Sequence, residues 1–311
     1  MNNILITGGA GFVGRNFIDL LSSNYGKIYI IDNFSLGLRE SFTSDKIKII
    51  EFDLKNEFTI FDEIDCEELD EIWHFAANSD IPSGIKNINV DFENTFLTTL
   101  NTIKIAKKYK VNKFNFASSS AVYGDWNIAL KESLGPLKPI SNYGSMKLAS
   151  EAILCSFGFK EEVDINIFRF PNVVGVPATH GVILDFFKKI KINGFLDVLG
   201  NGTQKKSYLH VKELINAMNF INNKSNDNIN IINIGNNDNG ITVKEIAELV
   251  VKKYDNEIKI NYGENNYGWI GDVPRFKFNT DKLNNLGWRP KLSSYDSVEL
   301  AINEIFNSLN L

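Results

Sequence analysis

Two side chains near the middle of the chain have the types and the spacing needed for proton transfer. Tyr143 and Lys147 stand four residues apart, which places both on one face of a helix. An ammonium group beside a phenol favours the phenolate and is expected to lower the pKa of the tyrosine from about 10. Such a tyrosine accepts the proton of a hydroxyl group while hydride leaves the same carbon. The pair therefore indicates redox chemistry at a carbon that carries a hydroxyl group.

The spacing of tyrosine and lysine is not unique, because it recurs at Tyr109 and Tyr208. The serine-rich segment 117–124 is what distinguishes Tyr143. It follows an apolar run, 113–117, that predicts a buried strand. In open parallel sheets, ligands bind beyond the carboxyl ends of the strands. A serine hydroxyl at this point is placed to bond the reacting oxygen and hold it near the phenol, and a simple polar turn is the alternative.

A glycine-rich turn opens the chain between a predicted strand, 4–6, and a helix that begins near Phe12. Such a turn presents backbone N–H groups and the positive end of a helix to a pyrophosphate. We expect Gly8 to permit the tight turn, Gly11 to let a ligand approach the backbone, and Gly14 to let the helix pack on the strand. The position of this pattern directly after the first strand predicts a dinucleotide site.

Asp32 ends the second predicted strand, eighteen residues after Gly14. A carboxylate at this point accepts hydrogen bonds from the adenosine ribose hydroxyls and repels a 2′-phosphate, which favours NAD over NADP. Arg39 is the alternative phosphate partner nearby. Asp53 follows the third strand and is expected either to reach the adenine amino group or to begin a helix as its N-cap.

Strand-like and helix-like segments alternate along the first half of the chain, which predicts a parallel sheet covered on both faces. Helical periodicity is clearest over 92–109 and 145–159. Loops are expected around 171–181, 194–207 and 261–274, and the Asn-rich stretch 222–230 predicts a surface loop. The strands are predicted at 4–6, 27–32, 47–52, 71–75, 113–117, 164–170 and 230–235.

These elements predict an α/β fold: a Rossmann-type, doubly wound parallel sheet with a smaller C-terminal α/β lobe for the substrate. The NAD-binding domain is expected to comprise residues 1–172 plus about 211–240. The substrate lobe is expected to comprise about 173–210 plus 241–311. The chain has 311 residues, enough for two closely packed domains.

The composition narrows the classes of partner. A net charge of −5 argues against nucleic acid, and no apolar run has the length of a membrane span. Cys66 and Cys155 are the two cysteines and no export signal precedes them, so a cytoplasmic protein with reduced thiols is expected. The histidines, His74, His180 and His210, are too scattered to predict a metal site.

Four motifs together resemble the extended short-chain dehydrogenases/reductases, specifically the NAD-dependent nucleotide-sugar epimerase/dehydratase family. In chain order, they are Thr7 to Gly14, His74 to Ala77, Ser118 to Gly124 and Tyr143 to Lys147. Further similarities run to the end of the chain, at 169–175, 200–204, 271–274 and 286–290. Within that family, the chain is similar to UDP-glucose and UDP-glucuronate 4-epimerases.

The resemblance implies a role for each matching residue. Tyr143 corresponds to the catalytic base, Lys147 binds the nicotinamide ribose and tunes the tyrosine, and Ser119 matches the family's catalytic Ser/Thr. Asn172 would contact the sugar diphosphate. The family is commonly dimeric through the helices that correspond to about 92–109 and 143–159, although an apolar stripe there would equally suit the core. The expected contacts of the cofactor NAD are Gly8, Gly11, Phe12, Val13, Gly14, Asp32, Asn33, Ser35, Asp53, Leu54, Phe75, Ala76, Ala77, Tyr143 and Lys147.

Three departures from the family pattern bear on the substrate. Dehydratases carry an Asp-Glu pair directly after the catalytic Ser/Thr, whereas Ser120 and Ala121 stand here, which disfavours elimination of water. Many relatives hold the substrate phosphates with an Arg-Asp pair where this chain has Lys206 and Ser207. Lysine supplies charge without bidentate geometry. A further family arginine is replaced in the stretch 269–270.

The expected activity is oxidation of the C4 hydroxyl of a nucleotide-diphosphate sugar to a 4-keto species, as a nucleotide-sugar 4-epimerase. The alternative is a 4-dehydrogenase that releases the keto sugar, for example a GDP-linked hexose or heptose in surface-polysaccharide biosynthesis. Two rivals from other classes are a non-catalytic NAD-sensing protein and an S-adenosylmethionine-dependent transferase. The first typically loses the tyrosine or lysine, and the second would not need Tyr143 and Lys147, which are both present.

Overall fold

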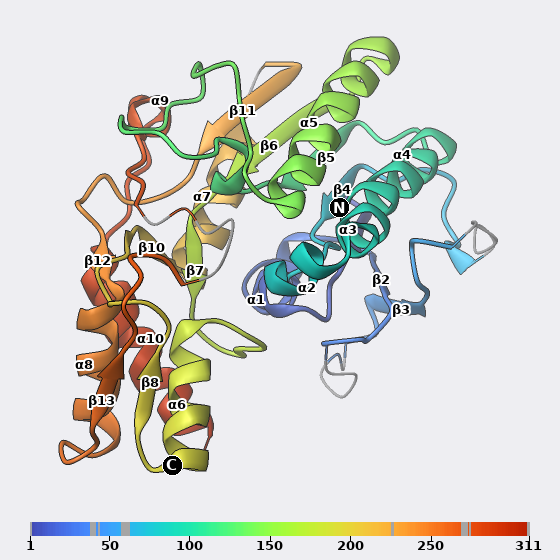
Figure 1. Ribbon diagram of the computed structural model, residues 1–311. Helices are drawn as coiled ribbons and strands as arrows, with labels where there is room; N and C mark the ends of the chain where they lie inside the picture. The colour runs from blue at the N-terminus through green and yellow to red at the C-terminus, as the bar shows by residue number, and fades with distance from the viewer. Residues whose placement is uncertain are drawn as a thin grey trace. The chain divides into compact units, whose positions relative to one another are not determined.

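The computed structural model describes residues 2–37, 42, 44–56, 63–224, 227–268, 273 and 275–309. The chain forms two compact units, each built from three separate segments (Figure 1). The first unit contains residues 1–122, 142–169 and 218–232, and the second contains 123–141, 170–217 and 233–311.

A seven-stranded sheet forms the centre of the first unit, with the order β11-β6-β5-β4-β1-β2-β3 (Figure 1). In this order, all neighbouring strands between β6 and β3 pair in parallel. The strand order reverses at β1, whose neighbours are β2 and β4, and this is the position where ligands bind in doubly wound folds. The α/β prediction is confirmed. The strands are β1 (Ile4–Thr7), β2 (Ile28–Asp32), β3 (Ile47–Glu51), β4 (Glu71–His74), β5 (Lys113–Ala117), β6 (Asp164–Arg169) and β11 (Ile229–Asn233).

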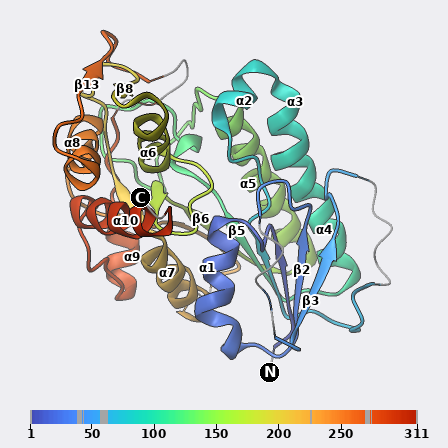
Figure 2. The same cartoon turned by 90° about the horizontal axis from the view of Figure 1, so that it is seen from below.

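Helices cover both faces of this sheet because alternate strand residues point to opposite sides (Figure 2). Phe114, Phe116 and Ile167 face α4 and α5 and share a core with Leu154 and Phe157 of α5. On the other face, Trp73 packs against Phe17 of α1, with ring centroids 4.4 Å apart and ring planes tilted by 44°. The helices are α1 (Phe12–Leu21), α2 (Ile81–Lys86), α3 (Ile88–Asp91), the π-helical turn η3 (Phe92–Leu97), α4 (Thr98–Lys108), α5 (Asn142–Glu161) and the end of α7 (Val211–Lys224); short 3-10 turns lie at Ser22–Asn24 and Ser120–Val122.

Among its described residues, the predicted surface loop at 222–230 holds only for residues 227 and 228, which are exposed, and is wrong at both ends of the stretch. Asn222 belongs to α7 and Asn230 to β11, and both are buried. Asn230 donates to Asn166 at 3.1 Å, and Asn166 donates to Asn115 at 2.9 Å. The three amides form a ladder across adjacent strands, because a buried amide is stable only when hydrogen bonded.

The second unit packs three helices, α6 (Val182–Asn193), α8 (Val243–Tyr254) and α10 (Ser294–Ser308), around an apolar core. Capping boxes begin α8 at Thr242 and α10 at Ser293. Short strands replace parts of the predicted loops. They form three pairs, β7 (Asn172–Val174) with β10 (Tyr208–His210), β8 (Leu196–Val198) with β13 (Ile260–Tyr262), and β9 (Lys205–Lys206) with β12 (Ile241–Thr242), and α9 (Asp281–Leu286) follows.

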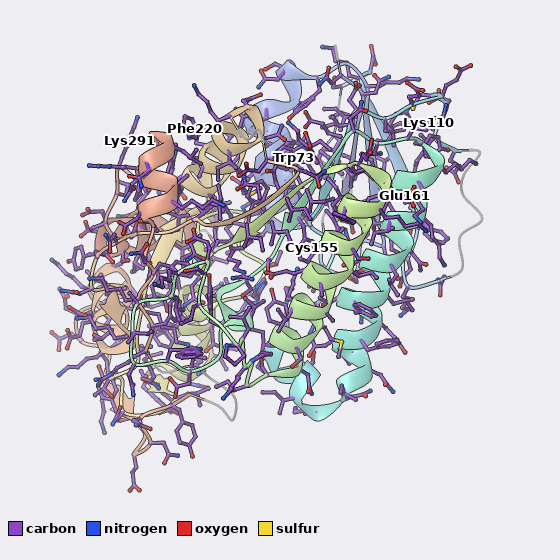
Figure 3. All side chains as sticks on the ribbon, turned by 90° about the horizontal axis from the view of Figure 1, so that it is seen from above. Trp73, Lys110, Cys155, Glu161, Phe220 and Lys291 are labelled. Carbon is purple, nitrogen blue, oxygen red and sulfur yellow. The ribbon has the colours of Figure 1, made fainter. Side chains whose placement is uncertain are left out.

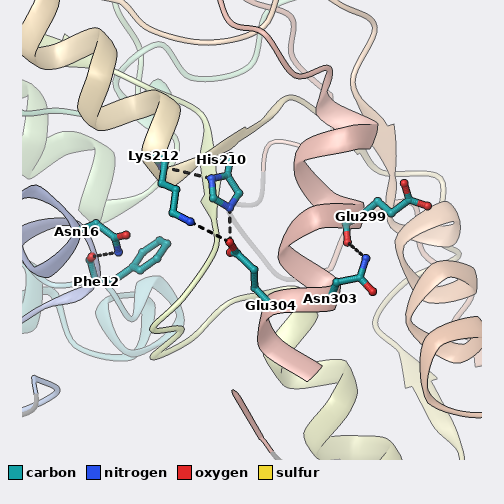
Figure 4. A network of polar contacts seen from close by, with 7 residues as sticks. All are labelled: Phe12, Asn16, His210, Lys212, Glu299, Asn303 and Glu304. Carbon is teal, nitrogen blue, oxygen red and sulfur yellow. Dashed lines mark hydrogen bonds and ion pairs between the residues drawn. The ribbon is translucent and has the colours of Figure 1, made fainter. Parts of the chain in front are cut away.

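Glu304 of α10 anchors the end of β10 within this unit (Figure 4). Its carboxylate bonds Nε2 of the buried His210 at 3.0 Å and Nζ of Lys212 at 3.3 Å. Nδ1 of His210 accepts the backbone N–H of Lys212, which assigns the ring proton to Nε2. The contact joins β10 and α10, and no reactive group is needed to explain it.

The compact units divide the chain differently from the predicted domains. Residues 123–141, 170–172, 211–217 and 233–240 belong to the second unit, although the expected NAD-binding domain included them. Tyr123 illustrates the cause, since its hydroxyl donates to Asn233 at 2.7 Å and its ring packs on Phe278. Which unit binds which ligand stays a prediction.

Candidate active site

The glycine turn joins the end of β1 to the start of α1. Gly8 has φ +67°, and a Cβ there would lie 2.6 Å from the backbone nitrogen of Ala76. A Cβ on Gly14 would overlap the carbonyl oxygen of Gly8 and the backbone of Gly9. Both positions therefore require glycine for the packing of the turn. Gly14 brings α1 against the turn itself, whereas we expected contact with the strand.

Gly11 differs from the other two glycines. A Cβ there would meet only the carbonyl oxygen of Gly8, at 3.3 Å. Packing alone would thus accept a side chain, which fits a position left bare for a ligand. Gly11 is also the N-cap of α1, and no side chain caps the N–H groups of that first turn, which includes Phe12 and Val13. Free N–H groups at a helix start suit a pyrophosphate, so this turn fits NAD.

Asp32 lies at the end of β2 and ties the glycine turn to it. Its two carboxylate oxygens accept the backbone N–H groups of Ala10 at 2.9 Å and Phe34 at 2.8 Å. Burial raises the pKa of this carboxyl, and the backbone hydrogen bonds oppose that rise. A carboxylate oxygen has more than one lone pair, so Asp32 keeps capacity to accept ribose hydroxyls.

The other residues expected to contact the adenosine already have partners within the protein. Asn33 donates to Asp53 at 3.2 Å and accepts the N–H of Ser35 at 3.1 Å. Asp53 accepts the N–H of Lys55 in a turn, and no helix begins among the described residues 53–56. Leu54 packs in the core, and its carbonyl accepts Asn101, so only the rest of its backbone is available to a ligand.

The end of β4 meets the end of β1 through a buried histidine. His74 bonds Thr7 Oγ1 at 2.6 Å and Thr99 Oγ1 at 3.0 Å. Burial, and then the charge of Lys147, hold the pKa of His74 well below its usual value, so the ring is neutral. The sequence alone does not indicate this role. His74 fixes the end of β4, and the chain continues from there into Phe75, Ala76 and Ala77, which are all partly exposed.

Three predicted catalytic residues meet at the carboxyl end of β5. Tyr143 and Lys147 lie one turn apart on α5, and Lys147 Nζ is 5.8 Å from the centre of the tyrosine ring. Lys147 is buried and donates to the carbonyl of Ala117 at 2.6 Å. Ser119 is hydrogen bonded to Tyr143. The structure therefore places the phenol, the ammonium group and the hydroxyl together within the first unit.

The acid–base state of this group differs from our expectation. Burial raises the pKa of Tyr143 to about 12, opposed by the hydrogen bond from Ser119 and assisted by the charge of Asp91. Burial also lowers the pKa of Lys147 to about 7, and Glu151 opposes that shift. Desolvation is the largest influence on this phenol, so the predicted lowering of the tyrosine pKa is wrong for the protein alone.

A buried acidic residue that sequence reasoning missed lies one turn beyond Lys147. Glu151 accepts Arg169 Nε at 2.9 Å and Arg169 Nη2 at 2.5 Å, and Ser118 donates to it as well. All three side chains are buried. The spacing of Tyr143, Lys147 and Glu151 along one helix face was the available signal. Arg169 appeared in the sequence only as part of a family motif.

Ser119 lies in the first unit, whereas the other two expected substrate contacts belong to the second unit. Asn172 is exposed at the start of β7, and Lys206 is half-buried in β9. The replaced arginine region at 269–270, most of the motif at 271–274 and Arg39 lie outside the described residues. Among the described residues, no cluster of His, Cys, Asp and Glu is placed to hold a metal ion. None of the helices that the structure describes is long and apolar enough to cross a bilayer.

A doubly wound sheet, a glycine turn at its first strand and a Tyr-Lys pair at the carboxyl end of β5 define a short-chain dehydrogenase/reductase. The sequence profile of the NAD dependent epimerase/dehydratase family matches residues 4–235. The chain belongs to this family. The predictions of family, NAD as cofactor and enzyme class are therefore confirmed.

Individual relatives extend over the whole chain. A putative UDP-glucose 4-epimerase from Methanocaldococcus jannaschii is 26% identical over 98% of this chain and 99% of its own length. A human dTDP-D-glucose 4,6-dehydratase is 26% identical over 96% of this chain and 88% of its own. A crystal structure of a UDP-galactose 4-epimerase is 31% identical, with a TM-score of 0.87 over 99% of both chains.

Proposed function

We propose that this protein is an NAD-dependent nucleotide-sugar 4-epimerase. The observation that carries the proposal is the group formed by Ser119, Tyr143 and Lys147, followed by Ser120 and Ala121 rather than by two acids. Two of the relatives, including the structure that is 31% identical, are named as UDP-sugar 4-epimerases. A uridine diphosphate sugar is therefore the first substrate class to test.

The chain's own residues divide the work of the reaction. Ser119 and Tyr143 hold the C4 oxygen between two hydroxyl groups, and Tyr143 takes the hydroxyl proton as hydride leaves C4. Bound NAD supplies the hydride acceptor and, in its oxidised form, a positive charge. Tyr143 then returns the proton to the oxygen when the keto sugar is reduced on its other face. Because burial raises the pKa of Tyr143, proton removal depends on cationic groups near the phenol.

The absence of an acid pair separates this proposal from dehydration. Elimination of water requires a group that protonates the leaving hydroxyl, and Ser120 and Ala121 cannot do so near neutral pH. Overall identity does not separate the two reactions, since the human dehydratase is as similar as the archaeal epimerase. The residues after Ser119 are the discriminating feature.

A 4-dehydrogenase is the second candidate, and Lys206 is the observation that favours it. This lysine stands where many relatives have arginine, and a point charge holds a diphosphate less firmly than a bidentate fork. A weakly held keto sugar would leave before its second reduction. Roles for Asn172 and Lys206 at the sugar diphosphate, a cytoplasmic location and a place in surface-polysaccharide biosynthesis remain parts of this proposal.

Product analysis tests the function directly. The purified protein is incubated with UDP-, GDP-, CDP- and dTDP-sugars, and the products are separated and weighed by mass spectrometry. We expect a product of unchanged mass and altered retention, absent with Y143F. A product that lacks two hydrogens, with NADH left on the protein, would establish the dehydrogenase instead. Loss of water would overturn the interpretation of Ser120 and Ala121.

We also propose a homodimer formed by the helices around η3 and α5. Apolar side chains remain exposed there: Ile88 is 53% exposed, Phe92 41% and Phe159 82%. In Figure 3, α5 lies beside α4 with Cys155 and Glu161 labelled along it, and Glu161 pairs with Lys107 of α4 at 2.9 Å. Light scattering should give twice the chain mass, reduced to the monomer in F92E/F159E. A monomeric parent protein would contradict the proposal.

A further inference from the structure

Three residues on one face of α5 bind three consecutive residues at the carboxyl end of β5, beginning with its last residue, Ala117. Tyr143 is hydrogen bonded to Ser119, Lys147 donates to the carbonyl of Ala117, and Glu151 accepts the hydroxyl of Ser118. The α5 residues are spaced by four, so each lies one turn after the last. The contact made by Glu151, the last of the three along α5, has no role in the proposed mechanism.

Glu151 is fixed in position by hydrogen bonds from residues at the ends of two neighbouring strands. Arg169, at the end of β6, donates to both of its carboxylate oxygens, and the pair is buried. The backbone N–H of Ser118 donates to Phe168, the neighbour of Arg169, at 2.8 Å. Strand β6, strand β5 and helix α5 therefore meet at this one carboxylate. A buried bidentate pair fixes both side chains in position.

The charges around the Tyr143–Lys147 pair show what Glu151 adds. His74 is neutral, and Arg169 is always charged. Without Glu151, Arg169 and Lys147 would be two cations buried within one cluster. One of them would have to lose its proton, and only the lysine can do so. The charged and titratable groups concerned are Tyr143 and Glu151 of α5, His74 of β4, Arg169 of β6 and Asp91 of α3.

We propose that Glu151, fixed by Arg169 and Ser118, is a positioning residue for the catalytic pair. It sets the turn of α5 that carries Lys147, and it supplies the negative charge that favours the ammonium form of this buried lysine. Any effect of Glu151 on catalysis rests on the proposed function. Its effect on the protonation of Lys147 exists in the protein without substrate or cofactor.

The test reads Lys147 directly by NMR. Protein labelled with ¹³C at the lysine ε carbon is titrated without substrate, and K147M assigns the resonance by its disappearance. The wild-type midpoint should lie at about 7. In E151Q it should fall by about one pH unit, because Arg169 is then an uncompensated cation nearby. In E151Q/R169M it should lie between the two, since both neighbouring charges are gone.

Glu71 supplies a matched control. It is a second buried carboxylate of the first unit, at the opposite end of the sheet, where it accepts Trp73 Nε1 at 3.0 Å and Asn222 at 3.1 Å. E71Q should lower the thermal unfolding midpoint and leave the titration of Lys147 unchanged. A shift in E71Q equal to that in E151Q would show a general loosening of the fold and overturn the proposal.

The remaining outcomes are also decisive. A folded E151Q whose Lys147 titrates as in the wild type would refute the role. If E151Q does not fold, E151Q/R169M decides: a midpoint below the wild-type value supports the role, and an unchanged midpoint overturns it. Because no substrate is present, failure to detect epimerisation would count against the proposed function alone.

Discussion

The first unit buries two glutamates in different surroundings. Glu71 begins β4 on the face of the sheet that carries α1, and its partners Trp73, Asn222 and Tyr25 are neutral side chains. Glu151 lies at the carboxyl end of the sheet on the face that carries α5, paired with Arg169 beside Lys147. Both side chains are buried, with exposures of 8% for Glu71 and 3% for Glu151. What differs is the charge of the neighbours.

This difference separates structural from chemical use of a buried charge. A carboxylate among neutral donors needs only hydrogen bonds, and these join β4 to the end of α7. A carboxylate among cations also sets which of them keeps its proton. In a doubly wound sheet, ligands bind at the carboxyl ends of the strands, and the second kind of carboxylate occurs at that end.

The largest effect should follow from removal of the phenolic hydroxyl at the carboxyl end. Y143F is expected to reduce turnover by about 10²–10⁴-fold, because the C4 hydroxyl loses its proton acceptor. The glycine turn is untouched, so NAD should remain bound. Product formation and the nucleotide released on denaturation measure the two effects. Full activity in Y143F would show that another residue is the base. Glu151 would then have no catalytic pair to support, and its contrast with Glu71 would have no bearing on the reaction.

The two glutamates themselves should differ in their cost to stability. E151Q leaves Arg169 buried without its charge partner and should lower the free energy of unfolding by about 3–5 kcal/mol. E71Q removes a charge that only neutral groups contact, so about 1–3 kcal/mol is expected. Urea unfolding of the two variants under one condition gives the ranking. Equal losses would mean that the neighbouring charge has no energetic consequence.

The sequence predicted the parts of this arrangement that depend on local pattern. Apolar runs located every strand of the main sheet, and the Tyr143–Lys147 spacing located one face of α5. Contacts between distant segments were not predictable. Arg169 meets Glu151 eighteen residues away, and Asn222 meets Glu71 from 151 residues away. The sign of the tyrosine pKa shift failed for the same reason, because burial is a property of the whole unit.

Gly14 and Gly11 allow the needs of packing and of ligand binding to be distinguished within the glycine turn. A Cβ in G14A would overlap the carbonyl of Gly8, so overpacking should cost about 1–3 kcal/mol of stability. G11A would contact only the carbonyl oxygen of Gly8, at 3.3 Å, so a smaller loss of stability than in G14A is expected. The NAD affinity of G11A should nevertheless fall by about tenfold, equivalent to about 1.4 kcal/mol. Calorimetric titration with NAD and thermal unfolding test the pair, and a G11A as destabilised as G14A, with normal affinity, would reverse the assignment.

The stability of the protein without ligands should also depend on pH through Lys147. The pKa of Lys147 is lowered from 10.5 to about 7, so between these values the unfolded chain holds a proton that the folded chain has released. Stability should therefore rise with pH in this window, by at most about 1.4 kcal/mol per pH unit. Tyr143 acts oppositely, but only above its unfolded pKa of about 10.

Urea unfolding of wild type and K147M from about pH 7.5 to about pH 9.5 isolates the lysine, because the window lies below the titration of Tyr143. The stability difference should change with pH in favour of the wild type. K113M provides the control at the other end of the sheet, since Lys113 also donates to a backbone carbonyl, that of Asn222 at 2.8 Å. A difference between wild type and K147M that stays constant would mean that the folded protein keeps the lysine proton. Glu151 would then offset the burial of Lys147 completely, and the contrast with Glu71 would be larger than we infer.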